Sequence, residues 1–151
     1  MLNELALVFG ISMVPVAELR AAVPFGIACD LPVWLVWVVS VVGNMVPVPF
    51  IILFIRRIFA WMKTKEGFLS RVVSVMEEKA EKGAKTFYKY EVFGLFVLVA
   101  IPLPGTGAWT GALVAAMLNL RLKNSVPTIF LGVAAAGLVM VALTTGVLAI
   151  V

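Results

Sequence analysis

The stretch Ile101-Pro-Leu-Pro-Gly-Thr-Gly-Ala-Trp-Thr-Gly111 interrupts a sequence that is otherwise suited to lipid. Its two prolines lack amide donors and disfavour helix just before them, while its glycines readily adopt positive φ. The residues on either side, 93–100 and 112–120, are almost wholly apolar. Irregular backbone at membrane depth is tolerated only where protein or a water-filled cavity surrounds it. The break therefore predicts a functional site.

The composition is that of an integral membrane protein. Of the 151 residues, 63% are hydrophobic and 13% are charged, and the mean hydropathy is +1.12. A bilayer core needs about 20 apolar residues for each helical crossing, so the chain can supply at most about four such segments. That is small for a transporter, which favours a homo-oligomer and first of all a dimer. We expect one all-α integral membrane domain over residues 1–151.

Residue types exclude several chemistries. The chain has no His and one Cys, so it offers no His or Cys cluster for a metal and no Ser/His/Asp set. Asp30 is its only Asp, which excludes proteolysis by paired Asp. The net charge of +4 comes from basic residues beside apolar segments, which suits anionic lipid better than nucleic acid. We therefore expect no cofactor, no metal, no nucleic acid and no enzyme activity.

The first half begins with two short apolar runs, 5–13 and 21–29, around a proline-marked segment that holds Glu18 and Arg20. Each run is too short to cross a bilayer. The pattern is typical of a re-entrant hairpin, which enters the membrane and leaves it by the same face. Residues 33–55 then carry no charge and predict the first full crossing.

Residues 56–91 hold nearly all of the charge. Apolar side chains recur there at spacings of three and four, and opposite charges four residues apart, such as Glu78 and Lys82, lie on the polar side. This pattern predicts one or two amphipathic helices on the membrane surface, with a connecting role in preference to a regulatory one.

The second half of the chain repeats the first. Residues 14–28 align without gaps on residues 101–115, and the prolines that begin the two motifs coincide. In each half the motif is followed by a polar break and then by an uncharged span, 33–55 and 126–151. We predict two inverted repeats, each a re-entrant helical hairpin followed by a transmembrane helix, an arrangement that secondary transporters use.

Charge then orients the repeats, 1–55 and 92–151, in the membrane. If the motifs are re-entrant hairpins, the connector and the loop 119–124 share one face, which is cytoplasmic by the positive-inside rule, with both termini outside. Four full crossings are the alternative, and they would place the basic residues of that loop outside. The face predicted to be cytoplasmic collects eleven of the twelve basic residues, namely Arg56, Arg57, Lys63, Lys65, Arg71, Lys79, Lys82, Lys85, Lys89, Arg121 and Lys123.

Glu18 and Arg20 are the only ionisable residues inside an otherwise apolar segment. A charge at the bilayer centre costs at least ~2.5–3.5 kcal/mol, so both must be paired, hydrated or neutralised. One interpretation is that Arg20 holds an anionic head group or pairs with Glu18, while Glu18 binds and releases a proton during transport. The other is a structural ion pair that fixes the hairpin.

Further candidates lie in the second motif and the first crossing. The amides of the Gly105–Gly107 turn could open into a helix N-terminus near Ala108 and hold an anion such as phosphate, or they could be satisfied within a tight turn. Asn44 could serve helix packing or line a substrate path. The full set of candidate substrate- or ion-binding residues is Glu18, Arg20, Asn44, Pro102, Pro104, Gly105, Thr106, Gly107, Trp109 and Thr110.

Several segments of the chain carry a family resemblance, namely Glu18-Leu-Arg20, Pro24-Phe-Gly-Ile-Ala28, Gly43-Asn44, Val46-Pro-Val-Pro49 and above all Pro102-Leu-Pro-Gly-Thr-Gly-Ala-Trp-Thr-Gly-Ala112. With these segments the chain resembles the small multidrug export protein family of prokaryotes, with Ala21 as a departure where Gly is expected. This resemblance implies a multi-pass inner-membrane protein that exports drug-like molecules. The proline-marked hairpins are also similar to the DedA-like superfamily, in which lipid-phosphate carriers are flipped or scrambled with the help of acidic and basic hairpin residues.

Two functions remain open from the sequence. The first is a transporter or flippase that moves an amphiphilic substrate, either a lipid phosphate or a drug-like molecule, by ion-coupled alternating access with protons as the coupling ion. The alternative is a non-transporting membrane scaffold or lipid-binding protein whose basic surface helices recruit partners or anionic lipid.

Overall fold

The computed structural model describes residues 2–64, 74, 90–103 and 106–150, and every regular element in these ranges is an α-helix. The predicted all-helical class is confirmed for this part of the chain. The helices are α1 (Leu2–Met13), α2 (Glu18–Ala28), α3 (Val33–Met45), α4 (Pro47–Lys63), Tyr90–Ala100, α6 (Ala108–Met117) and α7 (Leu122–Leu148).

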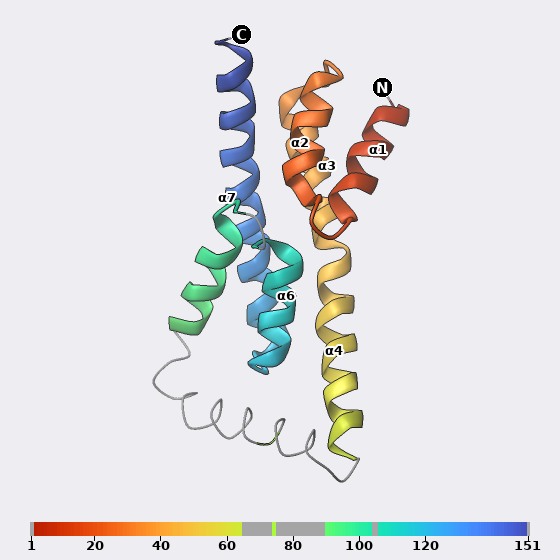
Figure 1. The fold of residues 1–151 in the computed structure, drawn as a ribbon, viewed down its shortest axis with the longest axis vertical. Helices are drawn as coiled ribbons and strands as arrows, with labels where there is room; N and C mark the ends of the chain where they lie inside the picture. Colours follow the sequence, from red (N-terminus) through yellow and green to blue (C-terminus); the bar gives the residue numbers. More distant parts are fainter. Residues whose placement is uncertain (1, 65–73, 75–89, 104–105, 151) are drawn as a thin grey trace.

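The helices form two pairs beside two long runs (Figure 1). α1 and α2 make a pair in the half of the molecule that holds both termini, and Tyr90–Ala100 and α6 make a pair in the opposite half. Both pairs turn near the middle of the molecule, whereas α3 with α4, and α7 by itself, run along its length. The two turns therefore meet at mid-length.

Two helical stretches are long and apolar enough to cross a bilayer, Val33–Met62 and Leu122–Leu148. In contrast, α1, α2 and α6 have 12, 11 and 10 residues. At 1.5 Å per residue such helices reach about 15–18 Å, roughly half of a bilayer core. The arrangement fits a membrane protein with two long crossings and shorter helices beside them.

The first long run continues further than expected. α3 ends at Met45 and α4 begins at Pro47, and Val46 between them keeps a helical backbone with its amide bonded to the carbonyl of Val42 at 3.2 Å, so the two helices form one run. α4 then passes residue 55 and ends at Lys63, because nothing in residues 56–63 interrupts a helix. The predicted amphipathic connector is therefore shorter than expected at its start, and most of it lies outside the described residues.

Two other helices begin earlier than the apolar pattern indicates. α2 begins at Glu18, so both charged residues of the first motif lie on a helix instead of in a turn. α7 begins at Leu122 instead of residue 126, because the amide of Ser125 already donates to the carbonyl of Arg121 at 3.0 Å. Polar residues in these first turns hid the true helix starts.

The second helices of the two pairs, α2 and α6, end in the same way. Asp30 has a φ of 56° and Asn119 has a φ of 51°, each just past the end of its helix. The amides of the following leucines, Leu31 and Leu120, then bond back to helix carbonyls at 3.2 and 2.9 Å. This is the Schellman arrangement, and in both halves the next long helix follows at once.

Each long run also approaches the first helix of its pair at a glycine. A Cβ at Gly43 would lie 2.8 Å from the carbonyl oxygen of Phe9, and a Cβ at Gly132 would lie 2.7 Å from the Cβ of Val99 and 3.2 Å from the carbonyl oxygen of Phe96. Only a residue without a side chain allows helices to pack this closely.

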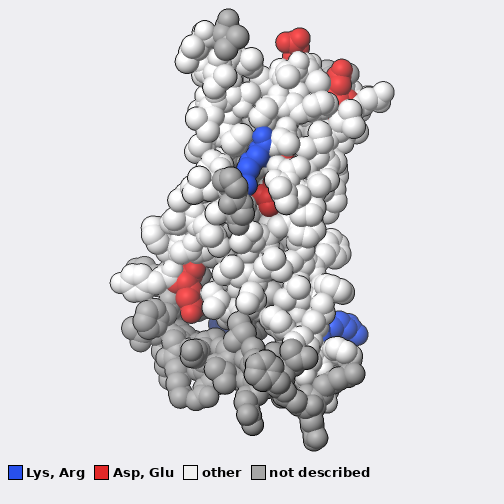
Figure 2. Space-filling model, in the orientation of Figure 1, with Lys and Arg blue, Asp and Glu red and all other residues white. Residues whose placement is uncertain are grey.

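Charge is sparse among the described residues. On the face in Figure 2, most of the coloured side chains lie toward the two ends, and one basic and one acidic side chain lie together in the upper half of the view. Charge away from the ends is the feature that the fold has to accommodate.

Candidate functional site

Glu18 of α2 caps the N-terminus of α6. The amide of Trp109 donates to Oε1 of Glu18 at 3.2 Å, and the amide of Ala108 faces the same carboxyl group. The first amides of a helix have no partner within the helix and carry a partial positive charge. Glu18 is only 4% exposed, so its carboxyl group is held by the other half of the molecule instead of by water.

Gly107 makes room for this contact. As the residue just before α6, it has a φ of 126°, which only glycine adopts without strain. A Cβ at this position would overlap the carboxyl group of Glu18. The carboxyl group of Glu18 therefore occupies the space that a side chain at position 107 would take. The role of Gly107 in binding a substrate stays a prediction.

Arg20 holds the interrupted backbone of the second motif. Its Nη2 donates to the carbonyl oxygen of Thr106 and, at 3.0 Å, to the hydroxyl oxygen of Thr106. That hydroxyl also lies 2.6 Å from the carbonyl oxygen of Ile101 and accepts the amide of Leu103 at 3.1 Å. Thr106 thus closes the 101–106 turn on itself, and Arg20 fastens the turn to α2.

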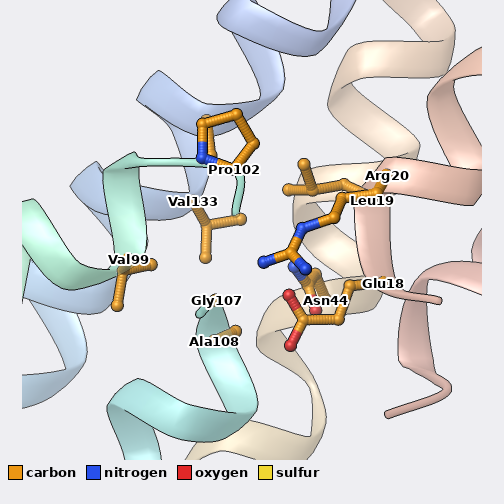
Figure 3. Close-up of a pocket in the computed structure, with 10 residues that line it drawn as sticks. Glu18, Leu19, Arg20, Asn44, Val99, Pro102, Gly107, Ala108 and Val133 are labelled. Atoms are coloured by element: carbon orange, nitrogen blue, oxygen red, sulfur yellow. The ribbon is translucent and has the colours of Figure 1, made fainter. Parts of the chain in front are cut away.

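Asn44 lies beside these two charged residues (Figure 3), and its side-chain amide faces the Glu18 carboxyl group from beyond normal hydrogen-bond length. It is fully buried on α3, and within the described part of the chain both its Nδ2 and its Oδ1 are without a partner. Buried polar groups are usually paired, because an unpaired amide loses its water without compensation. An unpaired amide beside a buried carboxyl group marks a site for a ligand or for water.

A small cavity joins these groups. Its lining includes Glu18, Arg20, Asn44, Pro102 and Gly107. Its volume is about 10 Å³, which leaves room for roughly one water molecule. A ligand larger than water therefore needs more room than the site has in this structure.

The remaining candidates fall at the edge of this site or outside it. Nε1 of Trp109 donates to the carbonyl oxygen of Met13 at 3.2 Å and so ties α6 to the end of α1. The amide of Thr106 donates to the carbonyl oxygen of Leu103 at 3.1 Å, so that amide is satisfied within the turn. Thr110 is partly buried in the first turn of α6. Pro104 and Gly105 lie outside the described residues.

Sequence reasoning missed two polar residues. Arg56 on α4 donates through Nη2 to the carbonyl oxygen of Leu120, at the far end of α6. Ser40 on α3 is fully buried, and its hydroxyl has no partner in the part that the structure describes. Arg56 was assigned to the charged connector, and Ser40 is a single small polar residue in an apolar span. Only the spacing of Ser40 one helical turn before Asn44 could have drawn attention to it.

The profile of the small multi-drug export protein family matches residues 18–139. The chain belongs to this family. The matched range begins at Glu18 and contains every residue of the site described above. The family description gives small multi-drug export as a proposed role, which indicates a membrane transporter in preference to an enzyme. The more distant similarity to DedA-like proteins stays a prediction.

Neither the comparison with curated proteins nor that with solved structures gives a match.

Proposed function

We propose that this member of the small multi-drug export family is a transporter or flippase that moves an amphiphilic substrate past the contact between its two halves. The observation that carries the proposal is that Glu18 and Arg20, from one helix pair, bind the interrupted backbone of the other pair. Membrane proteins keep buried charge and irregular backbone at mid-depth for substrate and ion paths. The export role of the family points the same way.

In this proposal the two helix pairs are re-entrant hairpins. Their helices are too short to cross a bilayer, and both pairs turn near mid-length (Figure 1). Each pair would enter and leave the membrane by its own side, one from the side of the termini and one from the opposite side. The turns would then meet at the midplane, where transporters bind their substrates.

The two halves would be inverted repeats. Their correspondence is supported by the same helix ending at Asp30 and Asn119. It is supported again by the close helix approaches at Gly43 and Gly132. These features follow one another in the same order in both halves. The connector and the loop 119–124 would face the cytoplasm, with both termini outside the inner membrane and a homodimer as the preferred assembly.

Transport would proceed by alternating access. With room for about one water molecule, the site has to open before a substrate can enter, and opening requires the contacts of Glu18 and Arg20 with the second motif to break. A proton on Glu18 would remove its charge and weaken its attraction to the positive end of α6. The polar and charged groups that face Glu18 are Arg20, Asn44 and the amides of Ala108 and Trp109.

The substrate would be amphiphilic. Its apolar part would lie in lipid, and its head group would enter between the turns. A lipid phosphate suits Arg20, and a drug-like cation suits Glu18 once Arg20 is bound elsewhere.

The test is translocation of a fluorescent polyprenyl-phosphate analogue in proteoliposomes, with and without a pH gradient. The parent protein should move the analogue faster with the gradient. Arg20→Ala should slow movement about tenfold or more, because the phosphate head group loses the guanidinium that would bind it. Glu18→Gln should fold and lose the response to the gradient. Arg57→Ala, an exposed arginine on α4, is the matched control and should behave like the parent.

Two outcomes would count against the proposal. Unchanged transport by Glu18→Gln would exclude the proton switch. No movement by the folded parent would exclude this lipid class and favour a drug-like cation or the scaffold alternative. The scaffold alternative predicts that replacing Lys79, Lys82, Lys85 and Lys89 has a larger effect than replacing Glu18 or Arg20.

A further inference from the structure

The N-terminus of α6 already holds an anionic group, and that group belongs to the protein itself. Gly107, just before the helix, has no side chain to cap it. The cap comes instead from Glu18 of α2, which accepts the Trp109 amide at 3.2 Å. Helix N-termini bind phosphate and carboxylate in the same way, through free amides and the positive end of the dipole. Glu18 therefore fills a position that suits an anion of another molecule equally well.

Asn44 gives independent support for a ligand. Its amide is fully buried, has no partner in the described residues and lines the same cavity as Glu18 (Figure 3). The Asn44 amide faces the Glu18 carboxyl group, but no hydrogen bond of normal length joins them, so Glu18 leaves the Nδ2 donor incompletely satisfied. An anion with more oxygens than a carboxylate could accept from Asn44 and from the α6 amides together.

Arg20 completes the set of donors. Its guanidinium lines the cavity and is held in place by Thr106, so it adds a fixed positive charge at the same spot. Backbone amides, one side-chain amide and one guanidinium converge there. The backbone N–H groups, the Nδ2 of Asn44 and the guanidinium are donors, and together they suit the oxygens of a phosphate or a carboxylate.

The backbone conformation at Glu18 suits a substitution by glycine. Its φ is 44°, in the left-handed region that a residue with a side chain seldom adopts. The segment before it is unusual as well, since Val16 has a φ of 76°. A glycine at position 18 accepts this backbone without strain and leaves the space of the carboxyl group empty.

We propose that Glu18 is the internal occupant of an anion site formed by the α6 N-terminus, Asn44 and Arg20, and that a phosphate or carboxylate group of the substrate takes its place when Glu18 withdraws. The assignment of this anion to a substrate rests on the proposed transport function. The site has room for only one of the two at a time, because its free volume matches about one water molecule. The substrate head group is then an anion, and a drug-like cation is not the natural ligand.

The experiment is thermal unfolding of the purified protein in detergent, in phosphate, formate or chloride at equal ionic strength. Glu18→Gly should unfold on the order of 4 °C higher in phosphate at ten times its Kd than in chloride. Formate should act in the same direction. A short-chain phosphatidic acid that acts at lower concentration than inorganic phosphate would assign the group to a lipid head group.

Two variants serve as controls. Glu18→Gln keeps an acceptor at the Trp109 amide and should show no preference for phosphate. Asp30→Gly replaces an exposed acid that has a similar φ of 56°, and it should also show none. The inference is overturned if folded Glu18→Gly responds to phosphate no more than these controls do.

A folding defect would still give an answer. Glu18→Gly that is monodisperse only when it is purified in phosphate would support the anion site. Glu18→Gly that is equally aggregated in phosphate and chloride, while Glu18→Gln is folded, would contradict it. Anion binding without transport of any substrate would contradict the proposed function alone, and transport without anion binding would contradict this inference alone.

Discussion

The two halves of the molecule share a scaffold and differ in what they contribute at its centre. Both end their second short helix with a residue of positive φ, and both bring a long helix close to a short one through a glycine. At mid-length the first half contributes the side chains of Glu18, Arg20 and Asn44, whereas the second half contributes backbone amides and carbonyls. Two halves with the same helix ends and the same glycine contacts can therefore differ at their centre, where one provides charge and the other provides the backbone that receives it.

We expect the largest effect at Gly107, where the backbone of the second half leaves no space for a side chain. Gly107→Ala should destabilise the protein by about 3 kcal/mol, because a side chain is strained at a φ of 126° and meets the Glu18 carboxyl group. Chemical denaturation in detergent measures the change, and transport should be lost with it.

Gly146→Ala is the matched control for that variant. Gly146 lies in α7 with no atom near the position of an added Cβ. Alanine there should stabilise the helix by about 0.5–1 kcal/mol. If the two alanine variants have equal stability, Gly107 does not shape the site.

The shared scaffold predicts a second and smaller effect. Gly43→Ala and Gly132→Ala should each cost about 1–3 kcal/mol, since each added methyl group overlaps the first helix of its own pair. The two losses should be similar in unfolding experiments. A large loss in one half with none in the other would show that the halves are not equivalent in packing.

The hydrogen bond from Arg56 to Leu120 tests the comparison of the two halves at the C-terminal end of α6. Arg56→Met should cost about 1–2 kcal/mol, because the carbonyl of Leu120 loses a charged donor. Arg57→Met changes an exposed neighbour on the same helix and should stay within about 0.5 kcal/mol of the parent. Equal stability of the two variants would remove Arg56 as a support of α6.

The smallest change in stability is expected at Asn44, where the effect on function should be large. Asn44→Leu should leave the free energy of unfolding unchanged or raise it by up to about 1 kcal/mol, since a buried amide without partners is removed. Transport of the polyprenyl-phosphate analogue should nevertheless fail. Ser40→Ala, which removes another unpaired buried group one turn away, should gain stability and keep transport.

A strong loss of stability in Asn44→Leu would instead make this residue a structural one.

Much of the fold could be read from the sequence, and the reasons are specific. The described residues 101–103 and 106–107 are not helical, as the prolines and glycines there predict, and the buried Glu18 and the partly buried Arg20 bind this segment and the start of α6. What the sequence could not supply is which group binds which. The sequence left open whether the amides of the second motif hold an anion or are satisfied within the turn. In the structure the Thr106 amide is satisfied within the turn and the Trp109 amide donates to Glu18, a contact between segments far apart in the chain.

The predicted helix boundaries were wrong where a charged residue lies within a helix. Arg56 was read as the start of a surface connector, yet α4 continues through it to reach the carbonyl of Leu120. Glu18 was read as part of a turn, yet it begins α2 with a positive φ. Charged residues are good markers of exposure in general, and they mislead where a distant backbone group satisfies them.

The two charged contacts of α6 have an electrical consequence. Glu18 lies at the positive end of its dipole and Arg56 near its negative end, and each end of a helix corresponds to about half an elementary charge. If α6 moves together with both side chains, almost no net charge crosses the field of the membrane. If either side chain stays behind, part of a charge moves, and each elementary charge is worth about 2.3 kcal/mol per 100 mV. The dependence of transport on clamped voltage therefore reports which of the two contacts breaks.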